Sequence, residues 1–185
     1  MPEYYFDLET YPKGSRPSPN DEVLTIQFQR LSSKTGEPMG NLTILKAWES
    51  SEETILRRFY KIFRPTKPFE FIPIGMNLDY DLFVLHNRWR KIGIDVSLET
   101  LFYNHPRIDI KPILVILNDG QFKGASLDRF TGKQYSGEVI PKWYEEKNYR
   151  AIEQYIQEEA REFIKLYQML KKRIPKIIQV EEISK

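Results

Sequence analysis

The chain has 185 residues, of which 41% are hydrophobic, 14% aromatic and 29% charged. This composition is typical of a globular domain and too apolar for a disordered chain. The 28 Lys and Arg residues nearly balance 26 Asp and Glu residues, leaving a formal charge of +2, so any nucleic-acid-binding surface must be a local patch. The chain has no cysteine and 2 histidines, which excludes disulfides, thiol chemistry and Cys/His zinc sites. A bound metal would need oxygen ligands, which Mg²⁺ and Mn²⁺ prefer.

The termini and the length bear on location and domain organisation. The chain opens with Met1-Pro2-Glu3 and has no apolar run of the roughly 18 residues that a membrane helix needs. We therefore expect no membrane span, no signal peptide and a cytoplasmic location. Pro175 is expected to end the last helix, which predicts one domain over residues 1–174 and a C-terminal tail over 175–185.

Three strands are predicted at the start of the chain. Residues 4–9 are rich in aromatic side chains, and residues 23–31 alternate apolar with polar side chains, as in a strand with one face in water. A segment with glycine and proline at 32–40 predicts a long hairpin tip before a third strand over 42–48.

Helices and strands alternate after this hairpin. A capping box, Ser50-Ser51-Glu52-Glu53, begins an amphipathic helix that Pro65 ends. The further predictions are a strand over 69–77, a helix over 80–91, a strand over 107–110, short helices within 111–147 and a long helix over 149–172. This order indicates an α/β fold with a mixed sheet flanked by helices.

Two carboxylates share the first predicted strand. Asp7 and Glu9 are two residues apart, so both side chains lie on the same face. Their like charges repel each other unless a divalent cation lies between them. The alternative is that the strand ends early and both side chains are in water.

A third carboxylate, Asp81, follows Gly75-Met76-Asn77 where the fourth strand ends and the second helix begins. Ligand groups of α/β proteins gather at such junctions. Ordinary helix capping explains Asp81 equally well.

The fourth carboxylate, Glu159, interrupts the apolar stripe of the last helix. With ~3.6 residues per turn, it lies ~40° from both Tyr155 and Phe163. A carboxylate in that position must be paired, protonated or bound to a metal. The alternative to a metal is a buried ion pair with Arg57, Arg88 or another cation.

These residues resemble the motifs of a known family, the 3′-to-5′ exonucleases of the ribonuclease-H-like superfamily that use three Asp and one Glu. The matches are Asp7 and Glu9 in the first strand, Gly75, Asn77, Tyr80 and Asp81 at the strand–helix junction, and Tyr155 and Glu159 in the last helix. The last pair is similar to the tyrosine subgroup, which includes proofreading domains of family-B DNA polymerases and small archaeal exonucleases. The resemblance covers residues 4–170, with one departure: Glu159 stands where the family has Asp.

The resemblance implies a ribonuclease-H-like α/β fold with a mixed five-stranded sheet and helices on both faces. It implies hydrolysis of DNA or RNA from single-stranded 3′ ends with two Mg²⁺ or Mn²⁺ ions. The implied metal ligands are Asp7, Glu9, Asp81 and Glu159. Tyr155 would orient the attacking water, and Leu8, Thr10 and Asn77 would hold the terminal nucleotide.

Two other functions stay open, namely a catalytically weak or inactive nucleic-acid-binding protein of the same fold and a structure-specific endonuclease. Basic and aromatic residues over 57–69 could bind a nucleic-acid backbone or form a solvated helix face over core aromatics. Asp109, near the end of the fifth strand, could support the site or cap a helix.

Overall fold

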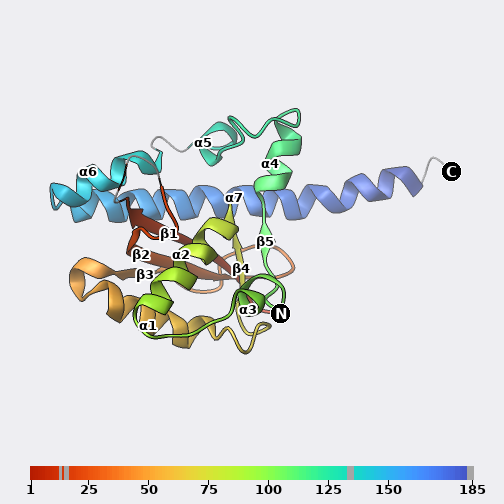
Figure 1. Cartoon of the computed structure of the whole chain (residues 1–185). Helices are drawn as coiled ribbons and strands as arrows, with labels where there is room; N and C mark the ends of the chain where they lie inside the picture. The colour runs from red at the N-terminus through yellow and green to blue at the C-terminus, as the bar shows by residue number, and fades with distance from the viewer. Residues whose placement is uncertain (13, 15–16, 133–135, 183–185) are drawn as a thin grey trace.

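The computed structural model describes residues 1–12, 14, 17–132 and 136–182, with side chains as far as residue 176. Its five-stranded sheet has the order β3-β2-β1-β4-β5 (Figure 1). The strands are β1 (Glu3–Tyr11), β2 (Glu22–Leu31), β3 (Thr43–Lys46), β4 (Ile72–Gly75) and β5 (Ile108–Asp109). The first three pair antiparallel, whereas β4 is parallel to both β1 and β5. The predicted mixed sheet is confirmed.

Helices cover both faces of this sheet, as expected. The helices are η1 (Ala47–Glu49), α1 (Glu52–Phe63), α2 (Leu78–Lys91), α3 (Leu98–Phe102), α4 (Lys111–Leu117), α5 (Leu127–Phe130), η2 (Gly137–Val139), α6 (Ile140–Glu145) and α7 (Tyr149–Glu182). The long helix α7 crosses one face, and α1 and α2 lie against the other (Figure 1). The short helices predicted within 111–147 are therefore present as α4, α5, η2 and α6.

Strand β1 divides the core because its side chains alternate between the two faces. Phe6 faces α1, where its ring lies 5.2 Å from that of Phe59 between centroids. Tyr5 faces α7, with its ring centroid 5.1 Å from that of Phe163. The central strand thus buries apolar surface on both sides of the sheet.

One face of β2 was wrongly predicted to lie in water. Thr25 and Gln27 have no exposed surface, at 0% each. They pair directly with Glu9 and Asp7 of β1, so they share the face that α7 covers. Their polar groups are satisfied internally, because the Thr25 hydroxyl donates to Gln27 Oε1 at 2.9 Å.

Some predicted element ends differ from the observed ones. The cap of α1 is Ser51 and not Ser50, since Ser51 Oγ accepts the Thr54 N–H at 3.1 Å. Glu53, the expected partner in the capping box, pairs instead with Arg57 at 2.8 Å. The helix therefore starts one residue later than the capping box predicts.

Two elements that contain a proline have ends that differ from the predicted ones. The strand predicted over 69–77 is the shorter β4 (Ile72–Gly75), which contains Pro73. Proline has no N–H to donate, and the pairing of β4 with β5 begins only at Ile74. α7 continues to Glu182, so the prediction that Pro175 ends it is wrong. A proline removes one helical hydrogen bond and bends the backbone, and good helix formers on both sides can carry the helix through.

The predicted division at residue 174 falls inside α7, and residues 183–185 of the expected tail lie outside the described residues. Across the described part of the chain, no helix is both long and apolar enough to cross a membrane.

Candidate carboxylate site

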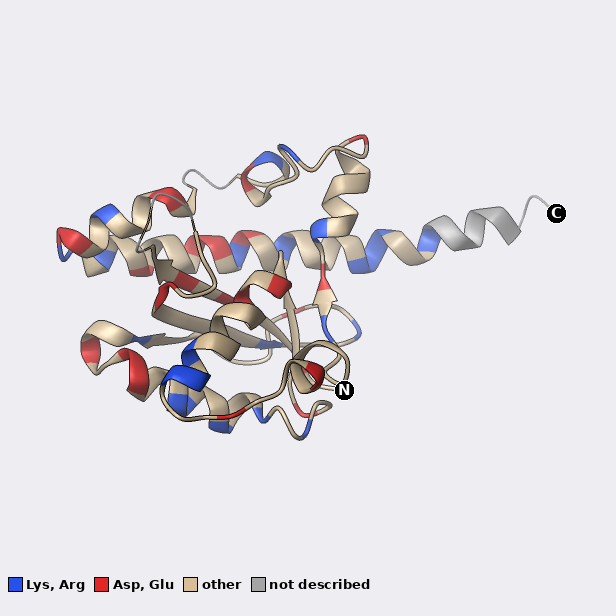
Figure 2. Cartoon of the chain, in the orientation of Figure 1, with Lys and Arg blue, Asp and Glu red and all other residues tan. Residues whose placement is uncertain are grey.

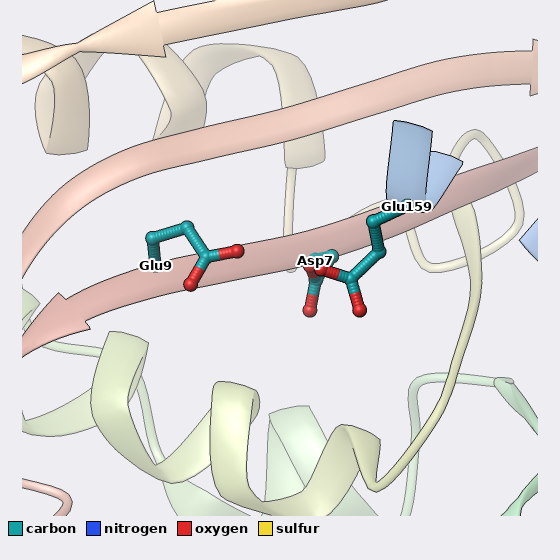
Figure 3. A group of neighbouring side chains, drawn as sticks. All are labelled: Asp7, Glu9 and Glu159. Carbon is teal, nitrogen blue, oxygen red and sulfur yellow. The ribbon is translucent and has the colours of Figure 1, made fainter. Parts of the chain in front are cut away.

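Asp7, Glu9 and Glu159 meet where α7 crosses β1. Each offers one carboxylate oxygen, and these three atoms lie within 4.8 Å of one another. Figure 3 shows Glu159 reaching from α7 toward Asp7, with Glu9 farther along β1. The period-two geometry of the strand brings Asp7 and Glu9 to this face, and the apolar stripe of α7 turns Glu159 toward the sheet.

An irregularity in pairing shapes the end of β1. Glu9 pairs with Thr25 while Thr10 pairs with Val23, so Leu24 is an extra residue on β2. Such bulges turn the strand and redirect its side chains next to functional sites. Beyond it, Glu9 and Thr10 line an open hollow of about 470 Å³ together with Leu8, Tyr80 and Gly137.

Asp7 is held in place from β2. Gln27 Nε2 donates to Asp7 Oδ2 at 2.9 Å, and the Gln27 amide oxygen accepts from Thr25. Both β2 side chains are buried, so this chain of hydrogen bonds fixes the rotation of the Asp7 carboxylate. Sequence analysis missed Gln27, and the signal that identifies it is the pairing register, which places it opposite Asp7.

Asp81 lies outside the group of three but close enough to interact electrostatically with it. It is 4% exposed in the first turn of α2. Burial, followed by the negative charges of Asp7 and Asp109, raises its pKa well above the ordinary range, and Glu159 adds to the effect. A cation at this site would reverse that shift by favouring the charged carboxylate.

Asp109 caps α2, which confirms the capping alternative for this residue. Its two carboxylate oxygens accept the backbone N–H groups of Asn77 at 2.9 Å, Leu78 at 3.0 Å and Lys111 at 2.8 Å. Asn77 has a left-handed backbone with φ of 64°, its side chain makes no capping bond, and the residue is exposed. The cap therefore fixes the turn that carries both Asn77 and Asp81.

Gly75 is required by the close approach of two strands. A Cβ atom there would lie 2.6 Å from the carbonyl oxygen of Phe6 and 2.5 Å from the Leu78 side chain. No side chain fits without moving β4 away from β1. Gly75 at the strand–helix junction thus has a steric role, because it allows the start of α2 to lie close to β1.

Tyr155 lies one helical turn before Glu159 and is 5% exposed. Its hydroxyl donates to the Glu159 carboxylate, and burial together with the charges of Glu9 and Glu159 raises the pKa of the phenol. The hydroxyl therefore stays protonated at neutral pH. Because Tyr155 and Glu159 are four residues apart, α7 alone sets this contact.

The two named arginines of the ion-pair alternative for Glu159 are bound elsewhere. Arg88 forms a bidentate ion pair with Glu52, with Arg88 Nε donating to Glu52 Oε1 at 2.6 Å. Arg57 pairs with Glu53. The alternative in which one of these two arginines pairs with Glu159 is therefore wrong.

The basic residues of 57–67 are exposed over buried core aromatics, as in the alternative of a solvated helix face, although Phe69 at the end of this segment is 61% exposed. Phe59 and Phe63 are fully buried and cannot stack on bases. Arg64 and Lys67 both pair with Glu70, at 2.6 and 3.4 Å. Figure 2 shows Lys and Arg interspersed with Asp and Glu over the molecule, in keeping with its near-neutral charge.

Gly137 also borders the site, and no sequence signal indicated it. A Cβ atom on Gly137 would lie 3.5 Å from the Tyr155 hydroxyl and 3.9 Å from Glu9 Oε2. Helix η2 therefore packs over the site at van der Waals distance from both groups.

The site residues fit a divalent cation. The carboxylate oxygens offered by Asp7, Glu9 and Glu159 are hard ligands, and their separation of 4.8 Å or less allows a shared ion. Burial, and after it the charges of Asp7 and Asp109, raise the pKa of Asp81, so a fourth carboxylate lies within electrostatic reach of the group. The described side chains thus form a carboxylate cluster able to hold a metal of the Mg²⁺ or Mn²⁺ type.

No protein-family model matches this chain, and no curated protein matches its sequence. Solved structures of exonuclease I match its fold. The zinc-bound complex of E. coli exonuclease I with single-stranded DNA is 15% identical, with a TM-score of 0.63, and the match covers 97% of this chain and 42% of that chain. The E. coli enzyme with a dT13 oligonucleotide is 13% identical, with a TM-score of 0.62 and coverage of 97% and 43%.

This chain therefore spans less than half the length of these exonuclease I chains. At such identities the match establishes the fold. The predicted ribonuclease-H-like α/β class is confirmed.

Proposed function

We propose that this protein is a metal-dependent 3′-to-5′ exonuclease that acts on single-stranded 3′ ends of DNA or RNA, with the cytoplasm as its place of action. The observation that carries the proposal is the group of three carboxylates from β1 and α7, with Asp81 buried next to it. The fold shared with exonuclease I, which has been solved with single-stranded DNA, supports it.

In this proposal, Asp7, Glu9, Asp81 and Glu159 hold two divalent cations, Mg²⁺ or Mn²⁺. When bound, these ions lower the pKa of an attacking water and neutralise charge on the departing 3′ oxygen. The chain supplies the spacing, because β1 fixes Asp7 and Glu9 while α2 and α7 bring one carboxylate each.

Tyr155 is proposed to orient the attacking water. Its hydroxyl is protonated and sits between Glu159 and Gly137, at the edge of the hollow. A tyrosine in this position supports the proposal that the protein belongs to the tyrosine subgroup of these exonucleases, which includes the proofreading domains of family-B DNA polymerases.

The terminal nucleotide is proposed to lie in the hollow of about 470 Å³ that Leu8, Glu9 and Thr10 line. Asn77 is exposed on the turn that Asp109 caps, and its side chain makes no capping bond, so its amide is proposed to contact the nucleotide. The Thr10 hydroxyl lies 3.4 Å from that of Tyr80, which joins the two walls of this hollow.

The test is cleavage of oligonucleotides labelled at either end, with Mg²⁺ or Mn²⁺, for the wild type and Asp81→Asn. The asparagine keeps the size of the side chain and removes the charge. We expect stepwise shortening from the 3′ end by the wild type, and at least tenfold slower cleavage by the variant. Equal cleavage by both proteins would contradict the proposal.

A second candidate is a catalytically weak protein that binds nucleic acid. It is favoured by one observation, that Glu159 is longer by one methylene than the Asp of the resembling family. The same experiment distinguishes the two, because a binder would shift the mobility of the oligonucleotide with metal present and leave its length unchanged. Internal cuts at a branched or looped substrate would indicate a structure-specific endonuclease instead.

A further inference from the structure

A small cavity adjoins the carboxylate group, and its lining residues differ from those of the open hollow. Its volume is about 30 Å³, and its walls include Tyr5, Asp7 and Glu159 together with apolar side chains such as Leu127 and Phe163. A space of this size holds one water molecule, which needs on the order of three hydrogen-bonding partners.

Tyr5 brings a polar group to this cavity that nothing else in the described chain satisfies. The residue is 1% exposed, and its hydroxyl is buried without a hydrogen-bond partner among the described residues. The hydroxyl belongs to a residue that lines the same cavity as the carboxylates of Asp7 and Glu159. A buried hydroxyl left unpaired costs free energy that native proteins rarely accept.

We propose that the cavity holds one water molecule that links the Tyr5 hydroxyl to the carboxylates of Asp7 and Glu159. The Tyr5 O–H donates a hydrogen bond to the oxygen of this water. The two O–H groups of the water donate to one carboxylate oxygen of Asp7 and one of Glu159. This arrangement gives the water three hydrogen bonds and satisfies the buried hydroxyl.

The water makes Tyr5 a positioning residue for the site. Gln27 already holds Asp7 from β2, and the proposed water holds Asp7 and Glu159 from the opposite side. It fixes the rotation of a β1 carboxylate relative to an α7 carboxylate, which neither element does alone. Partners of this kind, behind the ligands, strengthen metal binding by orienting them.

The test compares Tyr5→Phe with Tyr4→Phe. Both variants remove one hydroxyl from β1, and Tyr4 points to the other face, where its ring stacks on Phe71 at 4.2 Å. The melting temperature without metal and the affinity for Mn²⁺ by titration calorimetry are measured for each variant and the wild type.

We expect Tyr5→Phe to lower the melting temperature by roughly 2–4 °C, because the water loses its donor. We also expect Mn²⁺ affinity to fall about tenfold for Tyr5→Phe and to change less than twofold for Tyr4→Phe. A higher melting temperature for Tyr5→Phe would overturn the proposal, since removal of a dry, unpaired hydroxyl stabilises a protein. Unchanged Mn²⁺ affinity would overturn the positioning role.

A crystal structure at high resolution gives a direct test of the water. We expect one density peak within hydrogen-bond distance of the Tyr5 hydroxyl, without anomalous signal in crystals grown with Mn²⁺. An anomalous peak in the cavity, or no peak, would overturn the proposal. Only the effect on metal affinity rests on the proposed function; if the wild type bound no Mn²⁺, the nuclease proposal would fail while the melting and crystal tests would still decide the water.

Discussion

The two faces of β1 differ in what they contribute to the protein. On the face toward α1 and α2, Phe6 and Leu8 are buried in the largest aromatic cluster of the core. On the face toward α7, Tyr5 packs on Phe163, but the next two side chains on that face, Asp7 and Glu9, are carboxylates. Consecutive residues of one strand thus alternate between apolar packing and a concentrated negative charge.

This difference shows how the fold can hold carboxylates that repel one another at close range. Burial of apolar surface stabilises the folded state by about 25 cal/mol for each Å². Like charges brought within 4.8 Å oppose it. Because the same strand carries both, the packed face holds the charged one in place. A bound cation, as proposed above, would offset the repulsion within the carboxylate group.

The largest expected effect on stability comes from the packed face. Phe6→Ala should reduce the free energy of unfolding by about 3–5 kcal/mol, because it leaves a cavity between β1 and Phe59. Urea denaturation followed by tryptophan fluorescence measures this loss. A reduction below about 1 kcal/mol would show that this face does not anchor the strand.

On the charged face, Asp7→Ala should leave the fold intact and reduce metal-dependent cleavage by ~100-fold or more, which corresponds to ~2.7 kcal/mol of transition-state stabilisation. In the melting temperature without metal, relief of like-charge repulsion and loss of the buried Gln27 hydrogen bond act in opposite directions, so cleavage is the decisive measurement for this variant. Cleavage within about threefold of the wild type would refute the assigned role of Asp7.

Glu159 tests the contribution of α7 to the same face. Glu159→Gln keeps the size of the side chain and should weaken Mn²⁺ binding and cleavage by at least about tenfold. Glu159→Asp, the matched control, should keep measurable metal-dependent activity because it retains the ligand type. If Glu159→Gln melted several degrees lower yet cleaved normally, Glu159 would be a structural residue.

The smallest expected effect is a dependence of stability on pH. The raised pKa of Asp81 means that the folded protein binds its proton more tightly than the unfolded chain, where the pKa is ~3.9. Without metal, the contribution of Asp81 to stability should therefore fall as pH rises above about 4, through the folded pKa. Melting curves from pH 4 to 8 measure this.

Two comparisons sharpen that measurement. The asparagine of Asp81→Asn does not titrate, so the melting temperature of this variant should change less between pH 4 and 8 than that of the wild type. Added Mn²⁺ should offset the loss in the wild type, because the ion favours the charged carboxylate. Identical profiles for Asp81→Asn and the wild type would show that Asp81 lies outside the shared electrostatic environment.

The amino-acid sequence alone determined the order of the elements and most of the candidate carboxylates. Period-two spacing placed Asp7 and Glu9 together, and the helical stripe singled out Glu159, because both signals depend only on local geometry. The same local reasoning failed for Thr25 and Gln27, whose alternation with apolar neighbours resembles that of a half-solvated strand.

Tertiary structure decided which other segments pack against each strand and helix. Whether a polar side chain faces water or a neighbouring helix depends on packing between segments far apart in the chain, which no local window contains. Gln27 contacts Asp7 only through strand register, Asp109 caps a helix about 30 residues before it, and Gly137 reaches Tyr155 through the docking of η2. These long-range contacts arrange the four carboxylates, because only the assembled core holds β1, α2 and α7 at fixed distances.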